Sequence, residues 1–248
     1  MVHIVSTLLL GPLLVYQGRR VRQQVPILPE PSGDRLGTTG SGPALSLLVT
    51  GDSAAAGVGA QSQQQALLGQ IVEGLADRFT VRWKLHAATG ATTASTIARL
   101  RDLAPTTFDV IVTSLGVNDV TAMVRRAKWL DQQKLLRQEM IELFRPKLIL
   151  LSGFPPVHSF PALPQPLRWY LGRRSTEFDR LLAREVAQES QIRHLPLSFA
   201  HGEELMASDG FHPGPPAYAL WGQHVAETIL HELTGMPNSR LTVPDRQC

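Results

Sequence analysis

One stretch decides the fold of this chain, Leu45-Ser46-Leu47-Leu48-Val49-Thr50-Gly51-Asp52-Ser53. Its first six positions are rich in apolar and β-branched residues and run into a glycine, which is typical of a buried strand. Two polar residues, Asp52 and Ser53, therefore stand where this strand ends. In a parallel sheet covered by helices, the carboxyl ends of the strands open onto the crevice that binds ligands. We expect Ser53 at that edge.

Strand-like and helix-like segments alternate along the rest of the chain. Short β-rich runs follow longer segments whose apolar residues recur at helical spacing. This order predicts an α/β domain, a three-layer α/β/α sandwich around a five-stranded parallel sheet with right-handed connections. The expected strands are 45–50, 81–86, 109–115, 147–151 and 192–199, and the expected helices are 61–79, 93–103, 128–144, 175–189 and 216–233.

Composition bounds the class of protein. The chain has 248 residues, 43% of them hydrophobic, which is enough for one sizeable core. The net charge is +3, and no nucleic-acid recognition motif accompanies the basic residues, so we expect no nucleic-acid partner. One cysteine, Cys248, excludes an intrachain disulfide. The histidines form no His-Glu-x-x-His motif, and we expect neither a metal nor another cofactor.

The N-terminal segment contains an apolar run at residues 8–15, far shorter than the ~20 apolar residues of a membrane-spanning helix. It also makes a poor signal peptide, because no basic residue precedes it. Arg19, Arg20 and Arg22 follow it. Two interpretations stay open: packing on the domain's own surface, which we favour, and a short helix lying on a membrane with its arginines at anionic headgroups.

These features divide the chain into three parts. Residues 1–42 are an apolar segment and linker that we expect to pack on the domain, residues 43–235 are the domain, and residues 236–248 are a C-terminal tail. Within the first part, residues 26–42 are rich in Pro and Gly and predict a connecting loop. We favour a cytoplasmic location, with membrane association as the alternative. The oligomeric state is left open.

The polar residues after the first strand have two interpretations. A serine between a strand and a helix presents its hydroxyl to the crevice, where a nearby base makes it a nucleophile. Asp and Ser are also good helix caps, and Gly-Asp-Ser alone favours that structural role. The small-residue stretch 54–59 after it is expected to form the wall of an open pocket.

A second motif, Asp209-Gly210-Phe211-His212, supplies a base. An Asp three residues before a His suits a tight turn that places the carboxylate against Nδ1 and leaves Nε2 free to face a serine. The alternative is an Asp-Gly turn with an incidental histidine.

Two further residues follow the second and third strands. Gly90 offers an unobstructed backbone N–H, and Asn118 offers a side-chain amide. Fixed donors of this kind stabilise the oxyanion that forms when an ester is cleaved, and the N–H of Ser53 is a third donor. Each residue, taken separately, also suits an ordinary turn.

Gly-Asp-Ser, a glycine after the second strand, Gly116-Val117-Asn118-Asp119 after the third, and Asp-x-x-His near the end resemble the ordered blocks of the SGNH/GDSL hydrolase family. The resemblance covers Leu45 to about Leu230. It implies a flavodoxin-like fold, a catalytic triad and an oxyanion hole. The triad would be Ser53, Asp209 and His212, and the oxyanion hole would be Ser53, Gly90 and Asn118. Asp52 and Asp119 would hold loops. One departure is Ala54, where the family's motif has Leu.

The main hypothesis is an esterase or lipase that acts on a small-molecule ester through a serine acyl-enzyme. One alternative uses the same triad for carbohydrate O-deacetylation or acyl transfer. Another, of a different class, is a membrane-surface binding module that has lost turnover. The Pro-rich loop Phe154–Pro166, its His158, and Trp169 and Tyr170 after it are expected to shape the substrate pocket.

Overall fold

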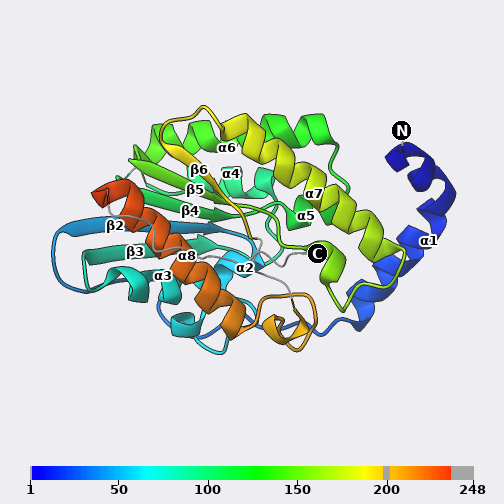
Figure 1. Cartoon of the computed structure of the whole chain (residues 1–248), viewed down its shortest axis with the longest axis horizontal. Helices are drawn as coiled ribbons and strands as arrows, with labels where there is room; N and C mark the ends of the chain where they lie inside the picture. The colour runs from blue at the N-terminus through cyan, green and yellow to red at the C-terminus, as the bar shows by residue number, and fades with distance from the viewer. Residues whose placement is uncertain (1, 105, 198–201, 236–248) are drawn as a thin grey trace, which may run out of the picture.

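The computed structural model describes residues 2–104, 106–197 and 202–235. At its centre lies a six-stranded sheet in the order β1-β3-β2-β4-β5-β6, with helices on both faces (Figure 1). The strands are β1 (Leu36–Thr39), β2 (Ala44–Gly51), β3 (Thr80–Ala87), β4 (Val110–Ser114), β5 (Leu148–Ser152) and β6 (Ile192–Leu195).

Five of these strands, β2 to β6, are parallel, and they are the five that the sequence predicts. The prediction missed one strand. β1 pairs antiparallel with β3 and forms an edge of the sheet inside the segment 26–42, which was expected to be a loop. With only four residues, mostly exposed, β1 carries no run of apolar residues that would reveal a strand.

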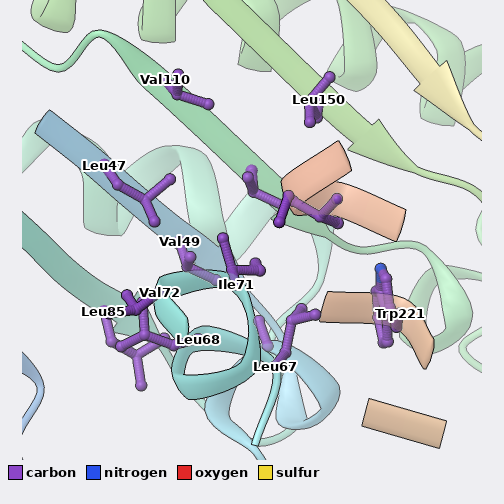
Figure 2. Packing of buried hydrophobic residues seen from close by; sticks show 14 of the residues in the cluster. Leu47, Val49, Leu67, Leu68, Ile71, Val72, Leu85, Val110, Leu150 and Trp221 are labelled. Carbon is purple, nitrogen blue, oxygen red and sulfur yellow. The ribbon is translucent and has the colours of Figure 1, made fainter. Parts of the chain in front are cut away.

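Two apolar cores lie on opposite faces of the sheet, and alternate residues of β2 enter them. Leu47 and Val49 join the core under α3 (Leu67–Leu75) and α8 (Pro215–Thr234), as Figure 2 shows. Leu48 points the other way, into the core under α4 (Thr93–Arg101), α6 (Arg126–Phe144) and α7 (Leu167–Val186). This two-residue alternation is why a continuously apolar strand builds a three-layer domain.

The helices differ from expectation at two places. The segment 61–79 forms a short 3₁₀ turn, Gln63–Gln65, before α3 instead of one long helix. α7 begins at Leu167, eight residues earlier than expected, directly after Pro166. Leu167, Tyr170 and Leu171 are buried at helical spacing, so this first turn belongs to the core. The remaining short elements are α2 (Ser53–Ala56), α5 (Val117–Thr121), and the 3₁₀ turns Val157–Ser159 and Glu203–Leu205.

The N-terminal segment forms a helix, α1 (Val2–Gln24), that lies beside the first turns of α7 (Figure 1). Leu14 is buried in the core of α7, and the side chain of Gln17 donates to Gln165 O at 2.7 Å and accepts from Leu167 N at 3.1 Å. Among the described residues, none of the helices has both the length and the apolar character to cross a membrane.

The register of the parallel strands brings their carboxyl ends to one edge. Gly51 at the end of β2 lies opposite Ala87 of β3 and Ser114 of β4, and Ser114 lies opposite Ser152 of β5. The loops that carry the polar motifs all leave the sheet from this edge. The last predicted strand was expected to continue to residue 199, and residues 198–201 lie outside the described part, as does the tail from 236.

Candidate active site

Ser53 is positioned by a sharp turn at the end of β2. Gly51 has φ +149°, and a Cβ there would lie 2.1 Å from Ser114 O, so the two backbones approach too closely for any other residue. Asp52 N donates to Ser114 O at 3.0 Å, and the Asp52 carboxylate caps α2 by accepting from Ala54 N at 3.0 Å. Ser53 thus opens α2 at the edge of the sheet, 9% exposed.

His212 lies against Ser53 although 159 residues separate them. Its Nε2 is 2.9 Å from Ser53 Oγ, and its Nδ1 is 2.5 Å from Asp209 Oδ2. The other carboxylate oxygen of Asp209 accepts from Phe211 N and His212 N, both at 2.9 Å. A turn at Gly210, with φ +62°, allows the carboxylate and the ring to meet within four residues. The structure therefore brings Ser53, His212 and Asp209 into one hydrogen-bonded chain.

The neighbours of Asp209 stabilise the ionised form of its carboxyl. Burial would raise the pKa of its carboxyl, but hydrogen bonds from the His212 ring and from the backbone of His212 and Phe211 outweigh burial and lower the pKa below its usual value. An ionised carboxylate accepts from Nδ1–H of His212. In that tautomer Nε2 accepts the Ser53 hydroxyl proton.

The pKa of the Asp52 carboxyl is shifted in the opposite direction, upward. Complete burial raises its pKa to about 6, against the lowering effects of the Ala54 N–H and of charge on His212. Its Oδ1 also accepts, weakly, from Ser114 Oγ at 3.4 Å. The carboxyl of Asp52 thus links the start of α2 to the end of β4 and touches neither end of the Ser53–His212 contact. Its contacts are those of a residue that holds loops.

Gly90 and Asn118 lie at the same edge of the sheet as Ser53. Asn118 lines the cavity beside Ser53, and its Nδ2 donates to Ala91 O at 2.9 Å, which joins it to the loop that carries Gly90. An amide Nδ2 bears two protons, so one remains for another acceptor. Gly90 has φ +78° and nothing within 4 Å of the position of a Cβ, so its surroundings are open.

Asp119, next to Asn118, anchors this loop. It is fully buried and accepts from Thr93 N at 3.0 Å and from Thr93 Oγ1 at 2.9 Å. Gln133 of α6 donates to the same Thr93 hydroxyl at 3.0 Å. The start of α4, α5 and α6 are therefore joined through Asp119 and Thr93, which anchors the backbone that follows Gly90 and Asn118.

An apolar cavity of about 60 Å³ adjoins Ser53 and His212. Its walls come from loops far apart in the chain and include Leu115, Phe160, Met206, Phe211 and Trp221. Sequence reasoning singled out the loop Phe154–Pro166, to which Phe160 belongs, but not the other four residues. Phe211 gave a signal, because it lies inside the Asp-Gly-Phe-His motif. The others become neighbours only through the fold.

Several predicted pocket residues lie elsewhere. His158 and Trp169 line a separate groove along α7, and Tyr170 is buried in the core. The stretch 54–59 is not an open wall, because three of its side chains, Ala55, Ala56 and Val58, are fully buried. Only Ala54 of that stretch faces the cavity. Apolar small residues next to a motif pack inward, since burial is their most favourable environment.

Among the described residues, no group of three or more His, Cys, Asp or Glu is placed to hold a metal ion. His194 bonds instead to Asp179 at 2.7 Å, and Asp179 also accepts from Phe154 N. This pair supports the loop after β5.

The parallel sheet and the hydrogen-bonded Ser53–His212–Asp209 chain have the arrangement of a hydrolase, and the family comparison agrees. The model of the GDSL-like lipase/acylhydrolase family matches residues 49–220. The match spans well over half of the chain and includes Ser53, Gly90, Asn118, Asp209 and His212. This chain belongs to that family, as the ordered motifs predicted.

Individual relatives are more distant. The chain is 26% identical to the GDSL-like esterase Rv1075c of Mycobacterium tuberculosis, over 94% of this chain and 79% of the relative. Among solved structures it resembles TesA, with a TM-score of 0.59, 23% identity, and coverage of 76% of this chain and 99% of that one. It also resembles a family two carbohydrate esterase from Clostridium thermocellum, with a TM-score of 0.60, 12% identity, and coverage of 78% and 66%. The two structural likenesses show the fold.

Proposed function

We propose that this protein hydrolyses carboxylic esters through a serine acyl-enzyme, with Ser53 as nucleophile. One observation carries the proposal: His212 contacts Ser53 Oγ at 2.9 Å through one ring nitrogen and Asp209 at 2.5 Å through the other. A hydroxyl, a base within hydrogen-bonding reach, and a carboxylate that orients the base are what nucleophilic catalysis by serine requires.

Each group has one task in the reaction. His212 Nε2 takes the Ser53 proton as Oγ attacks the ester carbonyl, and Asp209 stabilises the imidazolium that forms. The oxyanion accepts hydrogen bonds from Ser53 N, Gly90 N and the amide of Asn118. His212 then protonates the leaving alcohol, which leaves an acyl group on Ser53. Water, deprotonated by the same ring, releases the acid and regenerates the serine.

The cavity favours a short acyl group. The space open to the centre of a water molecule is about 60 Å³, an enclosure that suits a short acyl chain better than a long one. Its apolar walls suit a hydrocarbon, because a polar group buried there would lose its hydrogen bonds to water. We therefore expect acetyl and butyryl esters to be hydrolysed faster than octanoyl esters.

The test is a kinetic comparison of wild type and Ser53→Ala on p-nitrophenyl acetate, butyrate and octanoate. Ser53→Ala should lower kcat by roughly 10³-fold or more, since the nucleophile is lost and only binding and the oxyanion donors remain. A fluorophosphonate probe should label wild type and not Ser53→Ala. Ser190→Ala, at an exposed turn, is the matched control and should retain full activity and labelling.

Two results would overturn the proposal. One is near-normal turnover by Ser53→Ala while the variant keeps its fold by circular dichroism. The other is a wild-type protein that neither turns over any of the esters nor reacts with the probe. The second result would support a binding module that keeps the fold without turnover.

A further inference from the structure

α1 has two faces of different character. Leu10, Leu14 and Val21 recur at helical spacing and pack against the core of α7. The other face exposes large apolar side chains to solvent: Leu13 is 43%, Val15 55% and Tyr16 59% exposed. Isolated exposed apolar residues are ordinary. Three within four positions of one helix form an apolar patch, and such patches mark surfaces that bind a partner or a membrane.

Positive charge continues this patch. Arg19, Arg20 and Arg22 are exposed on the following turns of α1. α7, which α1 contacts, presents Trp169, Arg173, Arg180 and Arg184 along a groove, where Glu177 pairs with Arg126 of α6 at 3.1 Å. Apolar and aromatic side chains followed by clustered arginines match the acyl boundary and the anionic headgroups of a lipid surface.

α1 is also coupled to the candidate active site. Gln17 bonds to both Gln165 and Leu167, at the end of the loop after β5. In the same loop Phe160 lines the cavity, and Ala162 N donates to Gly210 O at 3.1 Å in the turn that carries His212. A partner that binds α1 would therefore lie close to the loop that lines the cavity.

We propose that the outer face of α1 docks the protein on the surface of an anionic lipid bilayer. Leu13, Val15 and Tyr16 enter the boundary between headgroups and acyl chains, and the arginines at 19, 20 and 22 contact the headgroup phosphates. The helix lies in the plane of the surface. Binding to the surface does not depend on turnover, so it stands apart from the proposed hydrolysis.

The test is co-sedimentation of the full chain with vesicles of phosphatidylcholine alone or of phosphatidylcholine with phosphatidylglycerol. Wild type and Ser53→Ala should sediment with the anionic vesicles, less at high salt, and little with the neutral ones. Leu13→Glu/Tyr16→Glu and Arg19→Glu/Arg20→Glu should each reduce partitioning by roughly tenfold or more. The matched controls are Leu135→Glu and Lys134→Glu on the exposed side of α6, which should bind as wild type.

Hydrolysis of soluble p-nitrophenyl acetate should be unchanged in every α1 variant, which shows that the domain is folded. The proposal is overturned if wild type ignores anionic vesicles, if it binds neutral vesicles equally, or if the α6 controls lose as much binding as the α1 variants. It is also overturned if sedimentation without lipid shows a dimer that Leu13→Glu/Tyr16→Glu dissolves, because the patch then holds a second copy of the chain.

A second, independent observation concerns Glu30, which lies before β1 and outside the segment matched by the family model. Its Oε1 accepts from Thr89 N at 3.0 Å and from Thr89 Oγ1 at 2.8 Å, and its Oε2 pairs with Arg35 at 2.7 Å. Arg35 in turn donates to Ala87 O at the end of β3. Two residues of the N-terminal linker thus hold both sides of the loop that leads to Gly90.

We infer that Glu30 is a positioning residue that fixes the N–H of Gly90 as an oxyanion donor, an inference that rests on the proposed function. Gly90 has φ +78°, and the position that a Cβ would occupy is open, so no side chain of its own packs there. Ala88 N donates to Gly51 O at 3.1 Å, and the bonds from Glu30 to Thr89 hold the residue directly before Gly90. A donor must be held in place before the reaction to stabilise the oxyanion fully.

The test compares Glu30→Ala with Glu30→Gln on p-nitrophenyl acetate. Glu30→Ala should lower kcat by roughly tenfold with KM little changed, a fraction of the 10²–10³ expected for removing a donor outright. Glu30→Gln keeps an oxygen for Thr89 and should restore most of kcat. Asp34→Ala, an exposed acidic residue in the same linker, is the control and should match wild type.

Wild-type kcat in Glu30→Ala, or equal losses in Glu30→Ala and Glu30→Gln, would overturn this inference. Fluorophosphonate labelling separates it from the proposed function. If wild type is labelled at Ser53 and Glu30→Ala behaves as wild type, only the role of Glu30 fails.

Discussion

In the proposed mechanism, Asp209 acts through the His212 ring that it orients. Its side chain is fully buried, and its Oδ2 contacts His212 Nδ1 at 2.5 Å. Asp209→Asn keeps the shape but offers an N–H where an acceptor is needed, or turns the ring to the other tautomer. We expect kcat on p-nitrophenyl acetate to fall by roughly 10⁴-fold, the scale of the same change in another serine hydrolase. Asp34→Asn serves as control, and an Asp209→Asn enzyme within tenfold of wild type would contradict this role.

Asp52 makes folding depend on pH. Its pKa is raised to about 6 from 3.8 by burial, so between these values the folded state holds a proton that the unfolded state has released. Stability must therefore fall as pH rises through this window, and the full cost is present above about 6. Two pKa units correspond to about 3 kcal/mol. Asp52→Asn removes the titration, so its free energy of unfolding relative to wild type should improve by about that amount between pH 4 and pH 7.

Urea unfolding of both proteins at the two pH values measures the difference. Asp209 does not interfere, because its pKa is lowered: its contribution is present above the unfolded pKa and is lost only as pH falls through the lower, folded value. Equal pH dependence in wild type and Asp52→Asn would show that folding does not raise the pKa of the Asp52 carboxyl.

At the scale of residues, the sequence indicates which side chains carry chemical groups for a reaction more readily than it indicates how buried each side chain is or what surrounds it. Ser53, Asp209 and His212 stand in motifs whose spacing is local, so their types and order can be read directly. The burial of Asp52 and the cavity position of Met206 depend on chain segments that meet only after folding. His158 shows the converse, because its place in a loop next to the site indicated the pocket, whereas the loop turns it towards α7.

At the scale of elements, the loop after β4 depends on the close packing of the Phe154 ring against Gly116. Gly116 has φ +119°, and a Cβ there would lie 2.3 Å from the ring of Phe154. Gly116→Ala combines backbone strain with a clash and should lower the free energy of unfolding by about 1–3 kcal/mol. It should also lower kcat, since Asn118 lies on the same turn.

Gly18→Ala is the matched control. Gly18 lies within α1, with nothing within 4 Å of the position of a Cβ. Ala favours helix over Gly by up to about 1 kcal/mol, so this variant should be neutral or slightly stabilised in the same urea titration. A Gly116→Ala protein as stable as Gly18→Ala would mean that Phe154 moves aside without cost.

Elements were predictable where periodicity is strong and the segment is long. β2, β4 and β5 are continuous apolar runs, and α8 keeps a helical pattern over its whole length. The sequence did not predict β1, because a four-residue edge strand pairs through its backbone and leaves no side-chain pattern. The first turns of α7 escaped because prolines before them favour a loop, although Leu167 to Leu171 bury a helical face.

At the scale of the whole molecule, the cavity forms where segments far apart in the chain come together. The loop after β4 gives Leu115, the loop after β5 gives Phe160, the segment before His212 gives Met206, and α8 gives Trp221. No one element encloses the space, which is why the sequence left acyl-chain length open. The sheet fixes where these segments start, and the side chains at their ends set the size of the space.

Met206 is the wall residue that can be shortened at least cost. It is only partly buried, and its backbone pairing with Pro213 does not involve the side chain. Met206→Ala should lengthen the cavity and raise the ratio of kcat/KM for octanoate to that for acetate by roughly 10–200-fold, the range for a single methylene in an apolar pocket. A ratio is the right measurement because it cancels any general loss of active enzyme. Met123→Ala, at an exposed site away from the cavity, should leave the ratio unchanged. An unchanged ratio in Met206→Ala would place the acyl chain outside this cavity while leaving the role of Ser53 intact.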